Sequence, residues 1–377
     1  MPNSADRMRR QLLQALATLP LLGPAGAALA GTGWEAWRLM VTQGISPDGR
    51  VVDHSQEDMR TTSEGQSYAL FFALVDNDQP LFDRILAWTQ DNLAAGDMTQ
   101  RLPAWLWGRD AQGAWRVLDE NPAADSDLWL AYALLEAGRL WNRPGLQAIA
   151  EGMLAQVRER EVIELPGLGP MLLPGPQGFI EADAIRVNPS YLPLPLLRRF
   201  AAVDRDGPWT ALAANTVELL RQVAAHGFAP DWAAWRDGSF VADPGKGTLG
   251  SYDAIRCYLW AGMLSPRDRL FRRQLEILHG PLHRLRGGGP MWERVDAASG
   301  KGEGEGGFGF RAALLPYLLA QDEATLAKSL QHGLPTPAQL AVQEPAYYAR
   351  MLMLFGLGWA ERRYRFGADG KLQPRWN

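Results

Sequence analysis

The chain has 377 residues, of which 47% are hydrophobic and 21% are charged, and this composition is typical of a globular protein with a large buried core. The formal net charge is −4, and no long run of like charges occurs. Nucleic-acid binding normally requires a clustered basic surface, so the charge pattern argues against a nucleic-acid partner.

Residues 1–30 have the pattern of a secretory signal peptide. A basic start is followed by the apolar stretch 12–22 and by the small-residue end Ala28-Leu29-Ala30. The basic residues are Arg7, Arg9 and Arg10. The apolar stretch is too short to span a bilayer, so we predict export to the periplasm with no membrane insertion of the mature chain. A helix at the start of the folded protein is the alternative. The remainder, 31–377, has no linker or break in composition and is predicted to form a single domain.

Helical spacing of apolar residues dominates that domain and favours an all-α fold. In chain order, the predicted helices are 34–43, 66–76, 80–94, 127–141, 146–160, 192–202, 208–225, 254–264, 266–279, 308–320, 323–331 and 344–362. Some of them, such as 127–141, are apolar on nearly every side and must be buried on every side, whereas others, such as 80–94, are amphipathic. This alternation predicts a double ring of helices and fits a plain helical bundle less well. The loops are rich in Gly and Pro, and 162–175 is predicted to form a small hairpin at a binding cleft.

Acidic residues stand at the starts of three of the most apolar helices. They are Glu64 in TTSEGQS, Asp125 in AADSD and Asp253 in GSYDA. Each one alone is explained by helix capping and by the helix dipole. If the inner helices run parallel, however, their N-termini gather at one end, and the three carboxylates face a common cleft. Two carboxylates across a cleft can cleave an acetal, one as acid and one as base.

Tryptophan is abundant, with 15 residues, and several lie outside the predicted core positions. Trp105 and Trp107 in LPAWLWG are candidates for platforms that bind sugar rings, although tryptophan also fills cores. These observations together favour a carbohydrate-active enzyme.

The residues around these acids resemble the endoglucanases of glycoside hydrolase family 8, and among them the periplasmic enzymes associated with bacterial cellulose synthesis. The family signature is Ala-(Ser/Thr)-Asp-(Ala/Gly)-Asp, two further residues, (Ile/Met)-Ala, and a Trp or Phe ten residues after that Ala. Here both acids, Ala131 and Trp141 match, whereas Ala124, Ser126 and Leu130 depart from the strict pattern. Similar blocks are TTSEGQSYA (61–69), RLPAWLWG (101–108), NPSYLP (188–193) and SYDAIR (251–256).

The resemblance implies an (α/α)6 barrel, with loop and hairpin insertions that form the cleft, and hydrolysis with inversion. It implies that Glu64 is the general acid, that Asp253 is the base that activates water, and that Asp125 holds a distorted sugar at the cleavage point. It also places Tyr191 and Arg256 around the base, and carries Asp127, the second acid of the signature, as a substrate-binding residue.

Other motifs do not predict a cofactor or a metal site. Residues 302–307 satisfy GxGxxG, but they follow no predicted strand and contain two glutamates that would repel a pyrophosphate. His279 and His283 are separated by Gly280-Pro281, which predicts that they do not share a helical face. We therefore expect catalysis without metal or cofactor.

The function predicted from sequence is an inverting endo-1,4-β-glucanase that acts in the periplasm on the β-1,4-glucan (cellulose) chain made by the same cell, with the cellulose synthase and export machinery as a further partner. Inversion predicts acid and base carboxyls about 6.5–9.5 Å apart. Three alternatives stay open: a hydrolase of the same family acting on chitosan, xylan or mixed-linkage glucan, a non-catalytic glucan-guiding protein, and a polysaccharide lyase.

Overall fold

A computed structural model describes residues 34–343 and 346–376 of the chain. The predicted signal peptide, residues 1–30, lies outside the described residues. Within the described ranges, no helix is both long and apolar enough to cross a bilayer.

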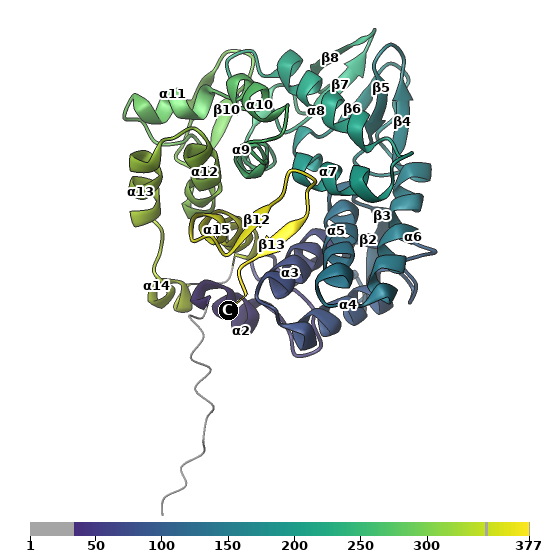
Figure 1. Cartoon of the computed structure of the whole chain (residues 1–377). Coiled ribbons are helices and arrows are strands. Elements are labelled where there is room, and N and C mark those ends of the chain that lie inside the picture. The colour runs from purple at the N-terminus through teal and green to yellow at the C-terminus, as the bar shows by residue number, and fades with distance from the viewer. Residues whose placement is uncertain (1–33, 344–345, 377) are drawn as a thin grey trace, which may run out of the picture. The chain divides into compact units, whose positions relative to one another are not determined.

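The described domain is built around an inner ring of helices (Figure 1). Each helix of the ring packs against the next, and the last packs against the first. The ring consists of α3 (Ser63–Val75), α5 (Ala124–Leu140), α7 (Leu194–Val203), α9 (Ala254–Met263), α12 (Phe308–Ala320) and α15 (Tyr347–Ala360). In α3, every residue except Glu64 is buried, because the helix is apolar on all sides and is surrounded by other helices.

Amphipathic helices pack around the outside of the ring. Along α4, for example, Leu81, Phe82 and Ile85 are buried and face α3. The outer helices are α2 (Glu35–Gly44), α4 (Gln79–Leu93), α6 (Pro144–Arg160), α8 (Trp209–Val223), α10 (Phe271–Ile277), α11 (Gly280–Arg286), α13 (Ala324–His332) and α14 (Pro337–Ala341). Inner and outer helices alternate along most of the chain, which confirms the predicted (α/α)6 barrel.

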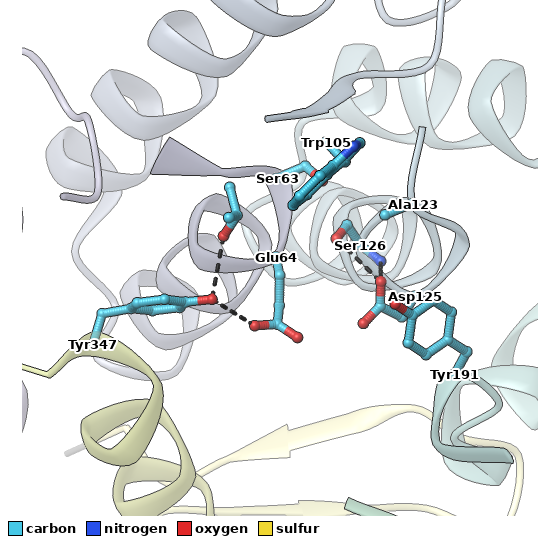
Figure 2. A pocket seen from close by; sticks show the side chains of 9 residues that line it. Ser63, Glu64, Trp105, Ala123, Asp125, Ser126, Tyr191 and Tyr347 are labelled. Atoms are coloured by element: carbon cyan, nitrogen blue, oxygen red, sulfur yellow. Dashed lines mark hydrogen bonds between the residues drawn. The ribbon is translucent and has the colours of Figure 1, made fainter. Parts of the chain in front are cut away.

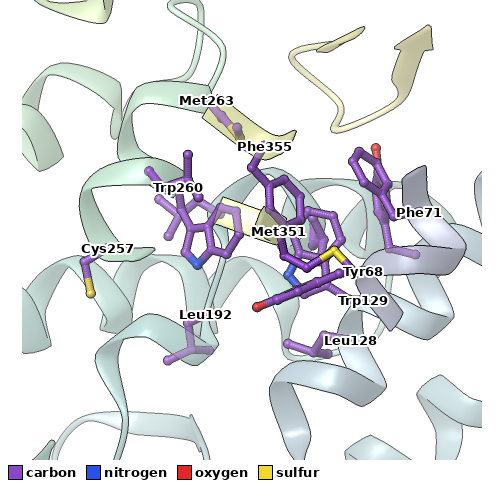
Figure 3. Packing of buried hydrophobic residues seen from close by; sticks show 14 of the residues in the cluster. Tyr68, Phe71, Leu128, Trp129, Leu192, Cys257, Trp260, Met263, Met351 and Phe355 are labelled. Atoms are coloured by element: carbon purple, nitrogen blue, oxygen red, sulfur yellow. The ribbon is translucent and has the colours of Figure 1, made fainter. Parts of the chain in front are cut away.

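The centre of the ring is filled by aromatic side chains (Figure 3). The Phe355 ring lies 5.0 Å from both the Tyr68 ring and the Trp129 ring, and Trp129 lies 5.2 Å from Trp260, measured between ring centroids. These residues come from α3, α5, α9 and α15, so one cluster joins four of the inner helices. Tilted and edge-to-face rings fill this space densely and stabilise the barrel beyond simple burial of area.

Two glycines allow the inner helices to approach closely. A Cβ atom at Gly356 of α15 would lie 1.8 Å from the Ala312 carbonyl oxygen of α12, and one at Gly262 of α9 would lie 2.1 Å from the Tyr317 backbone nitrogen. Neither position has room for a side chain. The contacts between α9, α12 and α15 therefore depend on glycine.

Short strands form small antiparallel sheets in the loops of the described domain. The predicted hairpin at 162–175 is present as β4 (Val162–Leu165) and β5 (Gly169–Leu172). The other sheets were not predicted: β1 (Thr61–Thr62) with β2 (Ala104–Arg109) and β3 (Trp115–Pro122); β6 (Ile185–Val187) with β7 (Ala233–Arg236) and β8 (Ser239–Ala242); β9 (Leu249–Gly250) with β10 (Arg294–Asp296) and β11 (Lys301–Glu303); and β12 (Tyr364–Phe366) with β13 (Leu372–Pro374).

One predicted helix was wrong. In place of a helix over 266–279, the chain forms the short α10, a break, and then α11, which begins at Gly280. Pro281 lies in the first turn of α11, where its missing N–H leaves no hydrogen bond unmade, so it starts a helix and does not prevent one. The prediction that His279 and His283 do not share a helical face was also wrong, because the His283 N–H donates a hydrogen bond to the His279 carbonyl (3.1 Å) and the two ring centroids are 4.8 Å apart.

The hairpin β12–β13 crosses the ring at the end where α5 finishes (Figure 1). Tyr132 of α5 donates a hydrogen bond from its hydroxyl to the Gly370 carbonyl (2.8 Å), and the Leu372 backbone N–H donates to Glu136 of α5 (2.7 Å). Phe366 packs against Phe71 of α3. The hairpin therefore closes one end of the inner ring.

Candidate active site

The three predicted acids lie at the N-terminal ends of inner helices. Glu64 is in the first turn of α3, after Thr62, whose hydroxyl caps the helix by accepting a hydrogen bond from the Gly65 N–H (3.1 Å). Asp125 is in the first turn of α5, and Asp253 immediately precedes α9. The structure thus brings these ends together at the end of the ring opposite the β12–β13 hairpin.

One guanidinium group joins the three acids. Arg256 is only 2% exposed and forms an ion pair with Glu64 through Nη1. Its Nη2 atom lies 2.9 Å from Asp253 Oδ1 and 3.7 Å from Asp125 Oδ2. Arg256 follows Asp253 by one turn of α9, and Ser190 Oγ accepts hydrogen bonds from its Nη2 (2.9 Å) and Nε (3.3 Å) atoms. A buried arginine keeps its charge, so it stabilises a concentration of carboxylates that would otherwise repel one another.

Glu64 projects into a pocket between the helix ends (Figure 2). Its Oε1 atom accepts a hydrogen bond from the Tyr347 hydroxyl (2.8 Å), and Tyr347 also contacts the Thr62 hydroxyl (3.3 Å). The side chain of Glu64 is 16% exposed. It can therefore reach a bound ligand, while Arg256 and Tyr347 hold its orientation.

Asp125 is the most deeply buried of the three acids. Its Oδ1 atom accepts hydrogen bonds from the Ser126 N–H (2.8 Å) and the Ser126 hydroxyl (3.3 Å). Burial raises the pKa of Asp125 to about 7, an effect that Arg256 opposes and that repulsion from Glu64 and Asp253 reinforces. This carboxyl therefore changes its charge near neutral pH.

Asp253 is held from two sides. Asn188 donates a hydrogen bond from Nδ2 to Asp253 Oδ2 (3.1 Å). On the backbone side, Asp231 Oδ1 accepts hydrogen bonds from the N–H groups of Ser251 (2.7 Å), Asp253 (3.1 Å) and Ala254 (2.8 Å). Asp231 therefore caps the start of α9. Burial, together with repulsion from Asp253, raises the pKa of Asp231 to about 6. The Asp253 carboxyl is 29% exposed and is open to water.

The predicted substrate-binding residues do not all lie at the pocket. Trp105 and Tyr191 line it (Figure 2). Trp107 is not among the lining residues and instead stacks on Trp115, with ring centroids 4.8 Å apart, under the guanidinium of Arg50. Two register shifts in β2 separate Ala104, Leu106 and Trp107, so regular alternation does not hold along this strand.

The prediction that Asp127 contacts substrate is contradicted by its burial. The Asp127 side chain is 0% exposed and faces Glu161, at the end of α6, away from the pocket. Residues two apart on a helix do not share a face. Since Asp125 points toward the pocket, Asp127 must point away from it.

Several residues of the site were not predicted from sequence. Tyr347 lies at the start of α15, a helix that was predicted, so the argument from gathered helix starts could have found it. Asn188 and Ser190 lie in NPSYLP, which was noted only as a similar block. Asp231 lies in a loop, and no motif in the sequence around it indicated a role at the site. In 34–343 and 346–376, no group of three or more His, Cys, Asp and Glu residues is arranged to hold a metal ion.

The arrangement supplies two solvent-accessible carboxyls, Glu64 and Asp253, from different inner helices, with Arg256 between them. One of them can protonate a leaving oxygen while the other activates water. Trp105 lines the pocket that Glu64 and Asp125 also line. These are the groups required to hydrolyse a bond between sugars.

Comparisons with known proteins agree with this arrangement. The family model described as glycosyl hydrolases family 8 matches residues 12–362. An endoglucanase of Xanthomonas axonopodis pv. citri (strain 306) is 53% identical over 373 residues, which cover 98% of this chain and 97% of that protein. The crystal structure of an endo-1,4-D-glucanase from Vibrio fischeri ES114 matches with a TM-score of 0.86 at 42% identity, over 91% of this chain and 99% of that one. That of an endo-β-1,4-glucanase from Acetobacter xylinum matches with a TM-score of 0.68 at 25% identity, over 87% and 97%. The chain therefore belongs to glycoside hydrolase family 8.

Proposed function

We propose that the protein is an inverting endo-1,4-β-glucanase that hydrolyses internal bonds of β-1,4-glucan chains. The observation that carries the proposal is that Arg256 pairs with both Glu64 and Asp253, and that Glu64 lines the same pocket as Trp105. The full-length similarity to endoglucanases supports the choice of glucan as substrate.

In the proposed mechanism, Glu64 protonates the glycosidic oxygen and Asp253 accepts a proton from the attacking water. Asn188 and Arg256 donate hydrogen bonds that orient the Asp253 carboxyl, and part of this carboxyl stays exposed to the attacking water. Asp125 and Tyr191, on the other side of the pocket from Tyr347 (Figure 2), hold the sugar ring at the cleavage point. Trp105 binds the apolar face of a neighbouring sugar. Arg256 keeps the three carboxylates close together.

The first test is the release of reducing ends from carboxymethylcellulose by residues 31–377 and by the Glu64→Gln variant. We expect activity in the unmodified protein and a loss of about 10²–10⁴-fold in the variant, the usual contribution of a positioned acid. The control is Glu120→Gln, which removes a carboxyl that is 78% exposed on β3. Equal activity in Glu64→Gln and Glu120→Gln would exclude Glu64 as the acid.

A second measurement tests inversion and substrate class. Proton NMR during the hydrolysis of a cello-oligosaccharide should show the α-anomer of the new reducing end first, because water attacks from the face opposite the leaving group. Initial β-anomer would overturn the inverting mechanism. A panel of chitosan, xylan and mixed-linkage glucan, compared with carboxymethylcellulose, tests whether β-1,4-glucan is the preferred substrate.

We further propose that residues 1–30 direct export to the periplasm, where the mature domain, 31–377, acts on cellulose as the cell's synthase and export machinery produce it. The support is the basic, apolar and small-residue order of this segment. The test is fractionation of cells that express the whole chain. A processed protein in the periplasmic fraction is expected, and an unprocessed protein in the cytoplasm would overturn the proposal.

A further inference from the structure

Two acidic side chains lie face to face behind Asp125. Asp127, in the first turn of α5, and Glu161, the residue that ends α6, are both 0% exposed. Within the described part of the chain, none of their four carboxyl oxygens accepts a hydrogen bond from an N–H or O–H donor elsewhere. The two carboxyls lie within hydrogen-bonding reach of each other.

The backbone around the two acids connects three elements. The Leu173 N–H donates a hydrogen bond to the Glu161 carbonyl (2.7 Å), and the Ala124 N–H donates to the Pro174 carbonyl (3.0 Å). The end of α6, the segment that follows β5 and the start of α5 therefore meet here. Asp125 belongs to the same turn of α5 and points the other way, into the pocket.

Elementary electrostatics restricts the charge of these two groups. A buried carboxylate is stable only when cations or N–H and O–H donors compensate its charge, and two adjacent buried carboxylates would also repel each other. A proton between the carboxyls removes both problems, because a protonated carboxyl is itself a donor. Burial raises the pKa of Glu161 to about 8 and that of Asp127 well above its ordinary value, with mutual repulsion adding to the shift for Asp127.

We propose that Asp127 and Glu161 share a proton at neutral pH and, as a hydrogen-bonded acid pair, position the start of α5 and with it the Asp125 carboxyl. The pair has a second effect: the shared proton leaves at most one negative charge behind Asp125, where two ionised carboxyls would place two. The ionisation of Asp125, which Arg256 favours and which Glu64 and Asp253 oppose, is therefore opposed less strongly by the pair. This inference rests on the proposed role of Asp125 at the cleavage point, but its tests do not measure hydrolysis.

The proposal makes a statement about pH. The other ionisable groups whose charges act on the pair are Asp125, on the opposite side of α5, and Arg160, the last residue of α6. Because the folded-state pKa of each carboxyl is raised above its unfolded value, the stability they contribute is full at low pH and is lost as pH rises through the folded-state value, about 8 for Glu161. Ionisation of the pair therefore loosens the start of α5 on the alkaline side.

Infrared spectroscopy of the C=O stretch of protonated carboxyls tests the proton directly. The reference protein carries Glu64→Gln and Asp125→Asn, so that neither of these two acids contributes to the band. At neutral pH we expect this band in the spectrum of the reference protein, and we expect its frequency to shift in D₂O. Adding Asp127→Asn or Glu161→Gln should abolish it, because the new amide donates to the remaining carboxylate.

The control is Asp243→Asn: Asp243 is 2% exposed but is paired with Arg186 (2.7 Å), so its loss should leave the band unchanged. A reference protein without the band, or a band that survives both amide substitutions, would overturn the proposal.

Thermal unfolding against pH gives a second readout, which also serves if an amide variant folds poorly. In the unsubstituted protein, the midpoint should fall as pH rises through about 8. In Asp127→Asn this alkaline decline should be shallower, whereas Asp243→Asn should keep it. An alkaline slope that is the same in all three proteins would contradict the shared proton, whether or not the protein hydrolyses glucan.

Discussion

At one end of the inner ring, the guanidinium of Arg256 contacts the three carboxylates of Glu64, Asp125 and Asp253. At the other end, the single carboxylate of Glu136 is bonded by the guanidinium groups of Arg139 and Arg199. Asp125 and Glu136 belong to the same helix, α5, and are about 16 Å apart along its axis at 1.5 Å per residue.

The ratio of charges decides what each end can do. Three acids with one cation leave negative charge uncompensated, and a carboxyl there titrates near neutral pH. One acid with two cations, and with a further hydrogen bond from the Leu372 N–H, has its charge fully compensated and serves only to join α5, α7 and the β12–β13 hairpin. Acid–base chemistry needs the first arrangement, whereas stability favours the second.

The largest effect should distinguish the roles of the two exposed acids. On a glucan, Asp253→Asn and Glu64→Gln should each lower kcat by about 10²–10⁴-fold. On an aryl β-cello-oligosaccharide whose leaving group is an acidic phenol, Glu64→Gln should recover most of its rate, because such a leaving group needs no proton. Asp253→Asn should not recover. Steady-state rates on the two substrates are the measurement, and the opposite pattern would exchange the proposed roles.

At the opposite end, substitution should affect folding and not catalysis. Glu136→Gln leaves Arg139 and Arg199 without their carboxylate and should lower the free energy of unfolding by about 3–5 kcal/mol. Denaturant titration measures this, and kcat per folded molecule should stay unchanged. The control on the same hairpin is Asp369→Asn, which breaks an exposed pair with Lys371 and should change stability by at most about 1 kcal/mol. Equal effects of the two variants would show that the buried network does not hold the hairpin.

The raised pKa of Asp125 predicts how stability depends on pH. Because the pKa of this carboxyl is about 7 in the folded state, against 3.8 for an unperturbed aspartate, its contribution to stability is full below about pH 4 and is lost as pH rises through 7. The loss is at most on the order of 4 kcal/mol. Asp125→Asn should flatten the decline in unfolding free energy across this window. If the decline persists in the variant, another group causes it.

The smallest effect is expected at the aromatic residues around the pocket. Trp105→Ala should raise KM for a glucan by up to roughly tenfold, about the strength of one aromatic contact, with less change in kcat. Trp115→Ala, on a 39% exposed ring that stacks on Trp107 outside the pocket lining, should raise KM less. A larger increase in KM for Trp115→Ala than for Trp105→Ala would indicate that the binding surface includes the β2–β3 hairpin.

Much of the barrel could be predicted from the sequence because its inner helices are apolar on every side, a pattern that only complete burial explains. The gathering of Glu64, Asp125 and Asp253 followed from the same pattern, since each acid precedes or begins such a helix. Apart from the β4–β5 hairpin, which its turn residues indicated, the short strands were missed because two to eight residues, in places with bulges, carry little periodicity. Arg256 was placed near the base only by resemblance, because nothing in a run of apolar residues shows that one arginine contacts three acids from distant segments.

Asp127 shows a different limit. Its separation of two residues from Asp125 was enough to predict opposite faces of the helix, but the resemblance to a signature placed both acids at the substrate, Asp125 as a catalytic residue and Asp127 as a substrate-binding residue. What lies on the opposite face, Glu161, comes from the end of another helix, and no local pattern connects the two.

The β12–β13 hairpin has a consequence for the order in which the protein can be completed. The segment 364–374 is translated after every helix of the ring, yet it supplies the Leu372 N–H to Glu136 and the Gly370 carbonyl to Tyr132 on α5, made more than two hundred residues earlier. A chain emerging from a ribosome or a translocation channel can pair Glu136 with Arg139 and Arg199, but it cannot complete the hydrogen bonds to α5 until this hairpin has also emerged. Closure of this end of the barrel therefore follows the synthesis of all six ring helices, and a chain shortened before residue 364 would lack the segment that closes it.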